Sequence, residues 1–120
     1  MHELAVMAGI IDVVSQYAKA QNAKKILDIR LTVGALRDFQ EVWVRHYFEK
    51  FSRGTLAEGA TITMAIQPIR FRCKACEHST EMGREAFINT PTATCEQCGS
   101  AELVLCSGSQ LMIDGIEVQL

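Results

Sequence analysis

Residues 73–98 read CKACEHSTEMGREAFINTPTATCEQC, and this stretch decides how the chain is organised. It holds two Cys-x-x-Cys pairs, Cys73 with Cys76 and Cys95 with Cys98, separated by 18 residues. Two residues between cysteines let both sulfurs reach one ion from a tight turn, so two such turns predict a tetrahedral four-sulfur site. These ligands favour zinc, and the closed coordination sphere indicates a structural role.

Two other interpretations of the pairs are weaker. Disulfides would require an oxidising compartment, and the N-terminus has no secretion signal to support one. A rubredoxin-like iron site uses the same four ligands, but such electron carriers usually need an aromatic shell. Only Phe71 and Phe87 are available here.

Three further residues could take part in metal chemistry, and each has a simpler interpretation. Cys106 lies beside the apolar run 103–105, which favours a small buried hydrophobe over a ligand. His78, two residues after the first pair, is expected to be a solvated loop histidine. His46 is expected on the surface of a helix.

Composition and charge narrow the class of protein. All five cysteines of the 120-residue chain lie between Cys73 and Cys106, and the net charge is −2. Residues 70–106 contain four basic and five acidic side chains, and zinc with four thiolates would add a further −2. Such a surface is poor for phosphate, so we expect no nucleic-acid partner. The longest apolar run, residues 4–11, is too short to span a bilayer, so we expect a cytoplasmic protein with no membrane partner.

The flanking sequence predicts regular elements before the cysteines. A helix is expected from residue 3 to about residue 21, because apolar side chains recur at three- and four-residue intervals: Leu4, Met7, Ile10, Ile11, Val14, Tyr17 and Ala18. Alternation then predicts a strand whose buried face carries Leu27, Ile29, Leu31 and Val33.

A second helix is expected over residues 39–52, with Asp38 and Glu41 resembling a capping box. Its apolar stripe favours core packing over a cofactor site: Phe39, Trp43, Val44, Tyr47, Phe48 and Phe51. A strand over residues 62–66 is interrupted by Pro68, and a last strand over residues 111–120 has a register break at Gly115.

These elements predict an α+β fold in which two helices pack on a small three-stranded sheet. A lone terminal strand cannot be buried by itself, so the last strand is expected to join the sheet formed by the first two. Residues 1–69 plus 107–120 would then form an α+β domain. Residues 70–106 would form a zinc-ribbon-like domain inserted before the last strand.

The first three residues, Met1-His2-Glu3, offer a second kind of metal site. The bulky His2 should preserve the initiator methionine, which leaves the Met1 amine next to the His2 amide. Amine, deprotonated amide and imidazole nitrogens can close fused chelate rings around one ion. Glu3 can fill a fourth coordination position through its amide or its carboxylate. Planar strong-field nitrogens select nickel(II) or copper(II) over zinc. The alternative is an exposed histidine followed by a glutamate that favours the helix dipole.

The whole chain resembles the HypA/HybF hydrogenase maturation proteins. The resemblance rests on Met1-His2-Glu3 opening an amphipathic helix, on the segments VGAL (33–36) and GTLAEGA (54–60), and on the paired cysteines. It implies a nickel metallochaperone, not an enzyme, with no catalytic residues. In that family the N-terminal Met-His-Glu binds nickel weakly and a separate zinc-ribbon-like domain holds structural zinc.

Carried onto this chain, the resemblance makes His2 the principal nickel ligand, with the Met1 amine and Glu3 completing the site. Cys73, Cys76, Cys95 and Cys98 become the zinc ligands. The implied partners are a HypB-type GTPase and the large-subunit precursor of [NiFe]-hydrogenase, and some members also serve urease maturation. A monomer or weak homodimer is expected.

Two departures from the family pattern limit the comparison. Some relatives have a histidine directly after a cysteine pair, whereas this chain has Glu77 and Gly99 there, so pH-responsive switching of the zinc site is not expected. An acidic side chain near the second helix supports nickel in some relatives, and either Asp38 or Glu41 could do so here. The alternative functions are a zinc-ribbon module that binds protein or nucleic acid and, last, a small metalloenzyme.

Overall fold

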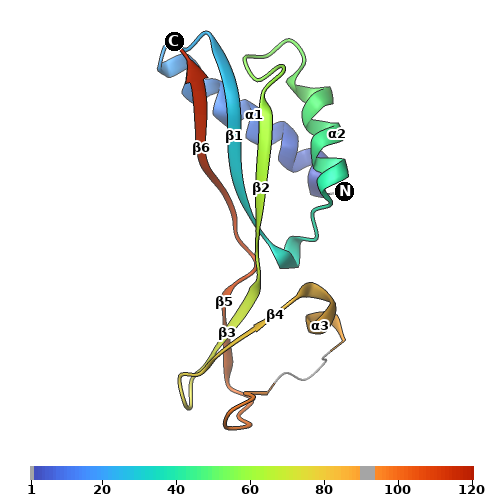
Figure 1. Ribbon diagram of the computed structural model, residues 1–120, viewed down its shortest axis with the longest axis vertical. Coiled ribbons are helices and arrows are strands. Elements are labelled where there is room, and N and C mark those ends of the chain that lie inside the picture. The colour runs from blue at the N-terminus through green and yellow to red at the C-terminus, as the bar shows by residue number, and fades with distance from the viewer. Residues whose placement is uncertain (1, 90–93) are drawn as a thin grey trace. The chain divides into compact units, whose positions relative to one another are not determined.

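A computed structural model describes residues 2–89 and 94–120 of the chain (Figure 1). Two compact units are found. Unit 1 comprises Met1–Thr32, Phe39–Ala65 and Met112–Leu120, and unit 2 comprises Val33–Asp38 and Ile66–Leu111. The division into domains 1–69 plus 107–120 and 70–106, with one metal assigned to each, stays a prediction. In the described part of the chain, no helix is both long enough and apolar enough to cross a membrane.

Unit 1 has the α+β architecture that the sequence predicts. Helices α1 (His2–Ala20) and α2 (Glu41–Ser52) accompany a three-stranded sheet in the order β2 (Thr61–Gln67), β1 (Lys25–Gly34) and β6 (Leu111–Gln119). Figure 1 shows the two helices on one face of this sheet. The last strand of the chain therefore does join the sheet formed by the first two.

Helix α1 buries most of its predicted stripe, namely Met7, Ile10, Ile11, Val14 and Ala18. The prediction is wrong for two residues of this stripe, because Leu4 is 37% exposed and Tyr17 is 61% exposed. The helix ends in a Schellman motif: Asn22 has a positive φ of 57°, its amide donates to Lys19 O, and the Ala23 amide donates to Ala18 O. Asparagine tolerates this left-handed conformation, which satisfies two terminal carbonyls.

The in–out alternation of β1 differs from the prediction near the start of the strand. Ile26 and Ile29 are both buried, whereas Leu27 is 39% exposed. Strict alternation would place Ile26 and Ile29 on opposite faces, so the pattern shifts by one residue between them. The Ile26 amide donates to Leu56 O, and the Asp28 carboxylate accepts a hydrogen bond from Thr61. Prediction of Leu27 as a core residue was therefore wrong.

The predicted capping box at the start of α2 is also wrong. Asp38 has a left-handed conformation after the short 3-10 helix η1 (Ala35–Arg37), and its carboxylate pairs with Arg84. The residue that caps α2 is Gln40, which makes no side-chain capping bond, so α2 begins two residues later than expected. Along α2, Val44, Tyr47 and Phe48 are buried as predicted, as is the preceding Phe39, but Trp43 is 49% exposed.

Unit 2 contains a second sheet that the sequence did not predict. Its order is β4 (Ser79–Met82), β3 (Ile69–Cys73) and β5 (Leu103–Ser107), all antiparallel, with a short helix α3 (Arg84–Ile88) after β4. Pro68 separates β2 from β3, as its lack of an amide donor predicts. The rings of Phe71 in β3 and Phe87 in α3 stack with their centroids 6.1 Å apart.

A close backbone approach within unit 2 joins the end of β1 to the segment before β6. The Gly34 amide donates to Gln110 O at 2.7 Å and the Leu36 amide donates to Gly108 O at 2.8 Å. A Cβ atom at Gly34 would lie 2.1 Å from Gly108 O. No side chain can occupy that space unless the backbone moves, so position 34 requires glycine.

Gly34→Ala should therefore lower the free energy of unfolding by about 2 kcal/mol or more, because the new methyl overlaps backbone atoms. The matched control is Gly9→Ala in α1, where a Cβ would meet nothing within 4 Å. Alanine in a helix interior is better than glycine, so this change should raise stability by roughly 0.5–1 kcal/mol. Urea unfolding checks both values, and equal effects of the two changes would contradict the close approach.

Candidate metal centre

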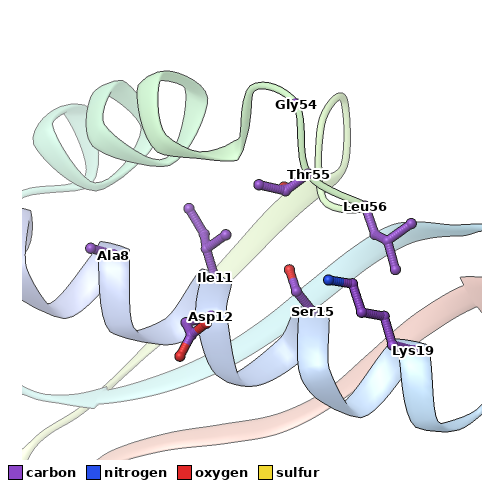
Figure 2. Close-up of a pocket in the computed structure, with 8 residues that line it drawn as sticks. All are labelled: Ala8, Ile11, Asp12, Ser15, Lys19, Gly54, Thr55 and Leu56. Carbon is purple, nitrogen blue, oxygen red and sulfur yellow. The ribbon is translucent and has the colours of Figure 1, made fainter.

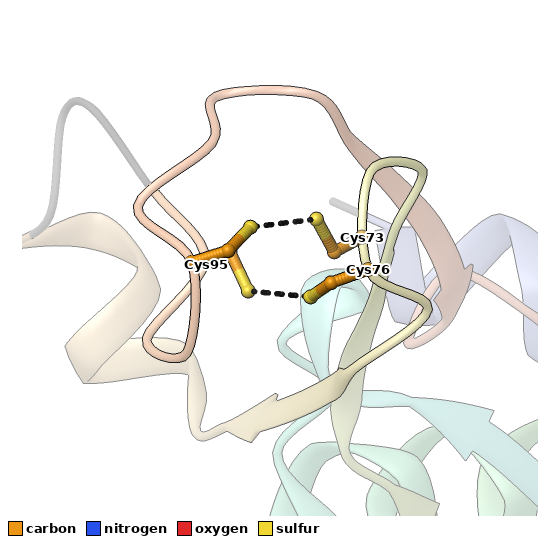
Figure 3. Close-up of side chains that lie close together, drawn as sticks. Cys73, Cys76 and Cys95 are labelled. Atoms are coloured by element: carbon orange, nitrogen blue, oxygen red, sulfur yellow. Dashed lines mark hydrogen bonds between the residues drawn. The ribbon is translucent and has the colours of Figure 1, made fainter.

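Four cysteine sulfurs meet at one place in unit 2. Cys73 is the last residue of β3 and Cys76 lies in the turn after it, while Cys95 and Cys98 come from a second turn before β5. Cys73 Sγ lies 3.6 Å from Cys98 Sγ, and Cys76 Sγ lies 3.5 Å from Cys95 Sγ. All four sulfurs lie within 4.8 Å of one another, and Figure 3 shows Cys95 facing Cys73 and Cys76 from the other loop.

The two turns that carry the sulfurs have the same backbone hydrogen bonds. In the first, the Cys73 amide donates to His78 O and the Glu77 amide donates to Cys73 O. In the second, the Cys95 amide donates to Ser100 O and the Gly99 amide donates to Cys95 O. Glu77 and Gly99 occupy equivalent positions and both have positive φ, 68° and 75°. Each pair is thus held by its own turn, which explains why a two-residue spacing was sufficient to predict the cluster.

Backbone amides favour the thiolate form of the first cysteine in each pair. The Cys98 amide, with the Gln97 amide, lowers the pKa of Cys95 to about 6, although burial acts in the opposite direction. The Cys76 amide likewise lowers the pKa of Cys73. Although the His78 amide opposes the change, burial and the neighbouring sulfurs raise the pKa of Cys76 to about 12. The pKa values of the cysteines are thus shifted in opposite directions. A cation at the centre would favour the thiolate form of all four, because it stabilises their negative charges together.

The geometry of the cluster fits a metal better than it fits disulfides. A tetrahedron with metal–sulfur bonds of about 2.3 Å has sulfur–sulfur edges of about 3.8 Å, close to the distances found. A disulfide would need about 2.05 Å, and all five cysteines are free. Among the described residues, this is the one group of three or more His, Cys, Asp or Glu side chains that could hold a metal ion.

The remaining residues near the cluster differ partly from expectation. Cys106 is exposed, so the prediction of a small buried hydrophobe was wrong. The adjacent Leu105 is also exposed, at 40%, so this end of β5 is not covered by a core. His78 lies in the loop as expected, with its side chain 31% exposed, and its Nε2 lies 2.9 Å from a Glu96 carboxylate oxygen, which links the two turns. Sequence reasoning missed this contact because the two residues are 18 positions apart and no local pattern pairs them.

Two of the three N-terminal candidates, His2 and Glu3, lie at the start of α1. Met1 lies outside the described residues, and His2 is described as the first residue of the helix, without its side chain. Glu3 is half-buried in the first turn. Of the two acidic candidates near α2, Asp38 pairs with Arg84 and Glu41 pairs with Arg45 at 2.8 Å. His46 is exposed as expected and its ring lies against Trp43 and Tyr47.

Comparison with known proteins gives one consistent result. The chain matches over residues 1–118 the family model "HypA: Hydrogenase/urease nickel incorporation, metallochaperone, hypA". Among curated relatives, "Hydrogenase maturation factor HypA" of Syntrophus aciditrophicus is 32% identical over 110 residues, covering 92% of this chain and 91% of that protein. The protein of the same name from Nitrosospira multiformis is 30% identical over 118 residues, covering 98% and 97%.

Solved structures agree on the fold. The solution structure of the Ni metallochaperone HypA from Helicobacter pylori has a TM-score of 0.64 at 19% identity and covers 98% of this chain and 97% of that one. A second solution structure of a HypA protein has a TM-score of 0.71 at 22% identity, covering 98% and 96%.

A serine replacement at Cys95 should abolish tight metal binding in unit 2, because it removes one of four converging thiolates. Cys106→Ser is the matched control, since its sulfur is exposed and outside the cluster. We expect about one tightly bound metal per chain for the parent and for Cys106→Ser, and much less for Cys95→Ser. Elemental analysis after gel filtration measures this. Metal loss from Cys106→Ser with retention by Cys95→Ser would contradict the assignment.

Proposed function

Because the chain belongs to the HypA family of hydrogenase and urease nickel-incorporation metallochaperones, we propose that it binds nickel(II) at its N-terminus and delivers it to the large subunit of [NiFe]-hydrogenase. The family consists of metallochaperones and maturation factors rather than enzymes. The observation that carries the proposal is the match over residues 1–118 in a chain that begins Met1-His2-Glu3. Nickel is therefore cargo, not a resident cofactor.

The position of His2 in the fold supports the nickel site. His2 is the first residue of α1, and the first four amides of a helix have no acceptor within it. A metal can therefore take the His2 amide nitrogen without breaking a helical hydrogen bond. The Met1 amine and the His2 imidazole would complete a planar nitrogen set, and Glu3 in the same turn would supply a carboxylate.

The helix dipole acts against a bound cation at this end. The positive end of α1 lies at His2, where a divalent cation is repelled and an acidic side chain is favoured. Glu3 is the acidic residue of this first turn and partly offsets the repulsion. A site made of these groups should bind weakly enough to pass the ion on, which is the property that a carrier needs.

We further propose that Cys73, Cys76, Cys95 and Cys98 hold structural zinc. Four sulfurs leave no open coordination position, so this metal would fold unit 2 and would not bind substrate. Cargo and structural metal are then separated by ligand type, because nitrogen and oxygen ligands suit nickel while soft sulfur ligands suit zinc. We assign a HypB-type GTPase and the hydrogenase large-subunit precursor as partners in delivery, with urease maturation proteins as further candidates.

Nickel titration of the untagged protein tests the cargo site. His2→Ala should abolish nickel binding, because it removes the imidazole, while zinc content and fold persist. His46→Ala is the matched control, since it removes an exposed histidine from α2 of the same unit. Calorimetry with zinc measured in parallel gives the readout. Nickel binding by His2→Ala as tight as in the parent would show that the proposed site is wrong.

Capping the Met1 amine provides a second arm of the same experiment. An N-terminal extension converts the amine to an amide and leaves the His2 side chain unchanged. We expect nickel binding to fall in the extended protein as it does in His2→Ala. Undiminished binding would exclude the Met1 amine as a ligand.

A further inference from the structure

A pocket lies in unit 1 between α1 and the turn that follows α2 (Figure 2). It has a volume of about 470 Å³ and is lined by five residues of α1 and three of the turn at 54–56. This volume is in the range of sites for small molecules. The family assignment and the metal centre give the pocket no role.

The Ser15 hydroxyl is the unusual feature of this pocket. Ser15 is only 9% exposed, and its Oγ is buried without a hydrogen-bond partner among the described residues. Figure 2 shows the hydroxyl directed toward the turn at 54–56. A helical serine commonly bonds a carbonyl one turn back, as Ser52 does with Glu49 O. Buried hydroxyls are nearly always paired, so the Ser15 hydroxyl indicates where a ligand atom would bind.

Lys19 supplies a cation to the same pocket. It lies four residues after Ser15 and therefore on the same side of α1. Figure 2 shows its amine directed toward the pocket, and no ion pair among the described residues includes it. The nearby Asp12 carboxylate accepts a hydrogen bond from Gln16 and points away from the turn. The pocket therefore presents two donors beside the turn, the Ser15 hydroxyl and the Lys19 ammonium, while its acidic lining residue, Asp12, is directed away from them.

The turn opposite the helix is held in place and leaves room for a ligand. Thr55 Oγ1 donates to Ser52 O and accepts from the Ala57 amide, and Leu56 O accepts from the Ile26 amide. Gly54 has a positive φ of 76°, and a Cβ there would meet nothing within 4 Å. The space beside Gly54 is thus open. Because the Ser15 Oγ itself is covered, a small shift of its side chain or of a turn side chain would bring it into contact with a ligand there.

We propose that this pocket binds a small oxyanion, a carboxylate or a phosphate group. The Ser15 hydroxyl and the Lys19 ammonium donate to its oxygens, and the apolar side chains of Ala8 and Ile11 contact the rest of the molecule. Hydrogen bonds from a charged donor to an oxyanion are among the stronger ones available to a protein. Ser15 lies about 20 Å along α1 from His2, so the site is separate from the proposed nickel ligands.

Amide NMR of the metal-loaded full chain tests this, with propionate and inorganic phosphate as separate probes. We expect saturable shifts centred on Ser15, Lys19 and the turn at 54–56. Binding of propionate alone assigns a carboxylate ligand, and binding of phosphate alone assigns a phosphate. Ser15→Ala and Lys19→Gln should each weaken binding roughly tenfold, because each removes a donor to the anion.

Matched controls separate the pocket from general charge effects. Ser52→Ala removes a buried hydroxyl that already has a partner, and Lys50→Gln removes an exposed cation from α2. Both should bind the probe as the parent does, and nickel binding should be unchanged in Lys19→Gln. Shifts that do not saturate with either probe, or binding unaffected by Lys19→Gln, would overturn the proposal and leave the proposed function untouched.

Discussion

The convergence of four cysteine sulfurs is the constraint on which unit 2 depends. Among the described residues of this unit, the buried apolar side chains are Val33 and Ile69, joined by Cys73 and Cys95 themselves. So few buried side chains cannot offset the conformational entropy of ordering three strands and two turns. A metal bound by both turns would supply the missing stabilisation, because its binding free energy is also folding free energy.

Unit 1 is stabilised differently, and this difference suits a carrier. Its core consists of apolar side chains from α1, α2 and the sheet, including Met7, Ile29 and Phe48. Of the proposed nickel ligands, His2 and Glu3 lie at the beginning of α1, where helical amides have no internal acceptors. Under the proposed function, nickel would bind and leave without disturbing the core, whereas the metal proposed at the four sulfurs would stay to hold unit 2. Two metals with two different roles then require two different donor sets.

Sequence alone predicted the features that depend on local spacing. The sulfur cluster follows from the two-residue spacing within each pair, and the buried stripe of α1 follows from helical periodicity. The failures depend on contacts between distant residues. Leu27 is exposed because the alternation of β1 shifts by one residue, and the second sheet was missed because cysteine turns weaken periodicity. No local signal pairs Ser15 with the turn at 54–56, since some 40 residues separate them.

Hydrogen exchange of the protein before and after metal extraction by a chelator tests most directly whether the sulfur-bound metal is the core of unit 2. We predict that amides of β3, β4 and β5 lose protection when the metal is removed, while those of α1 and β1 keep it. Retained protection throughout unit 2 in the metal-free protein would contradict this account, because the unit would then be stable without the ion that its four sulfurs are arranged to bind.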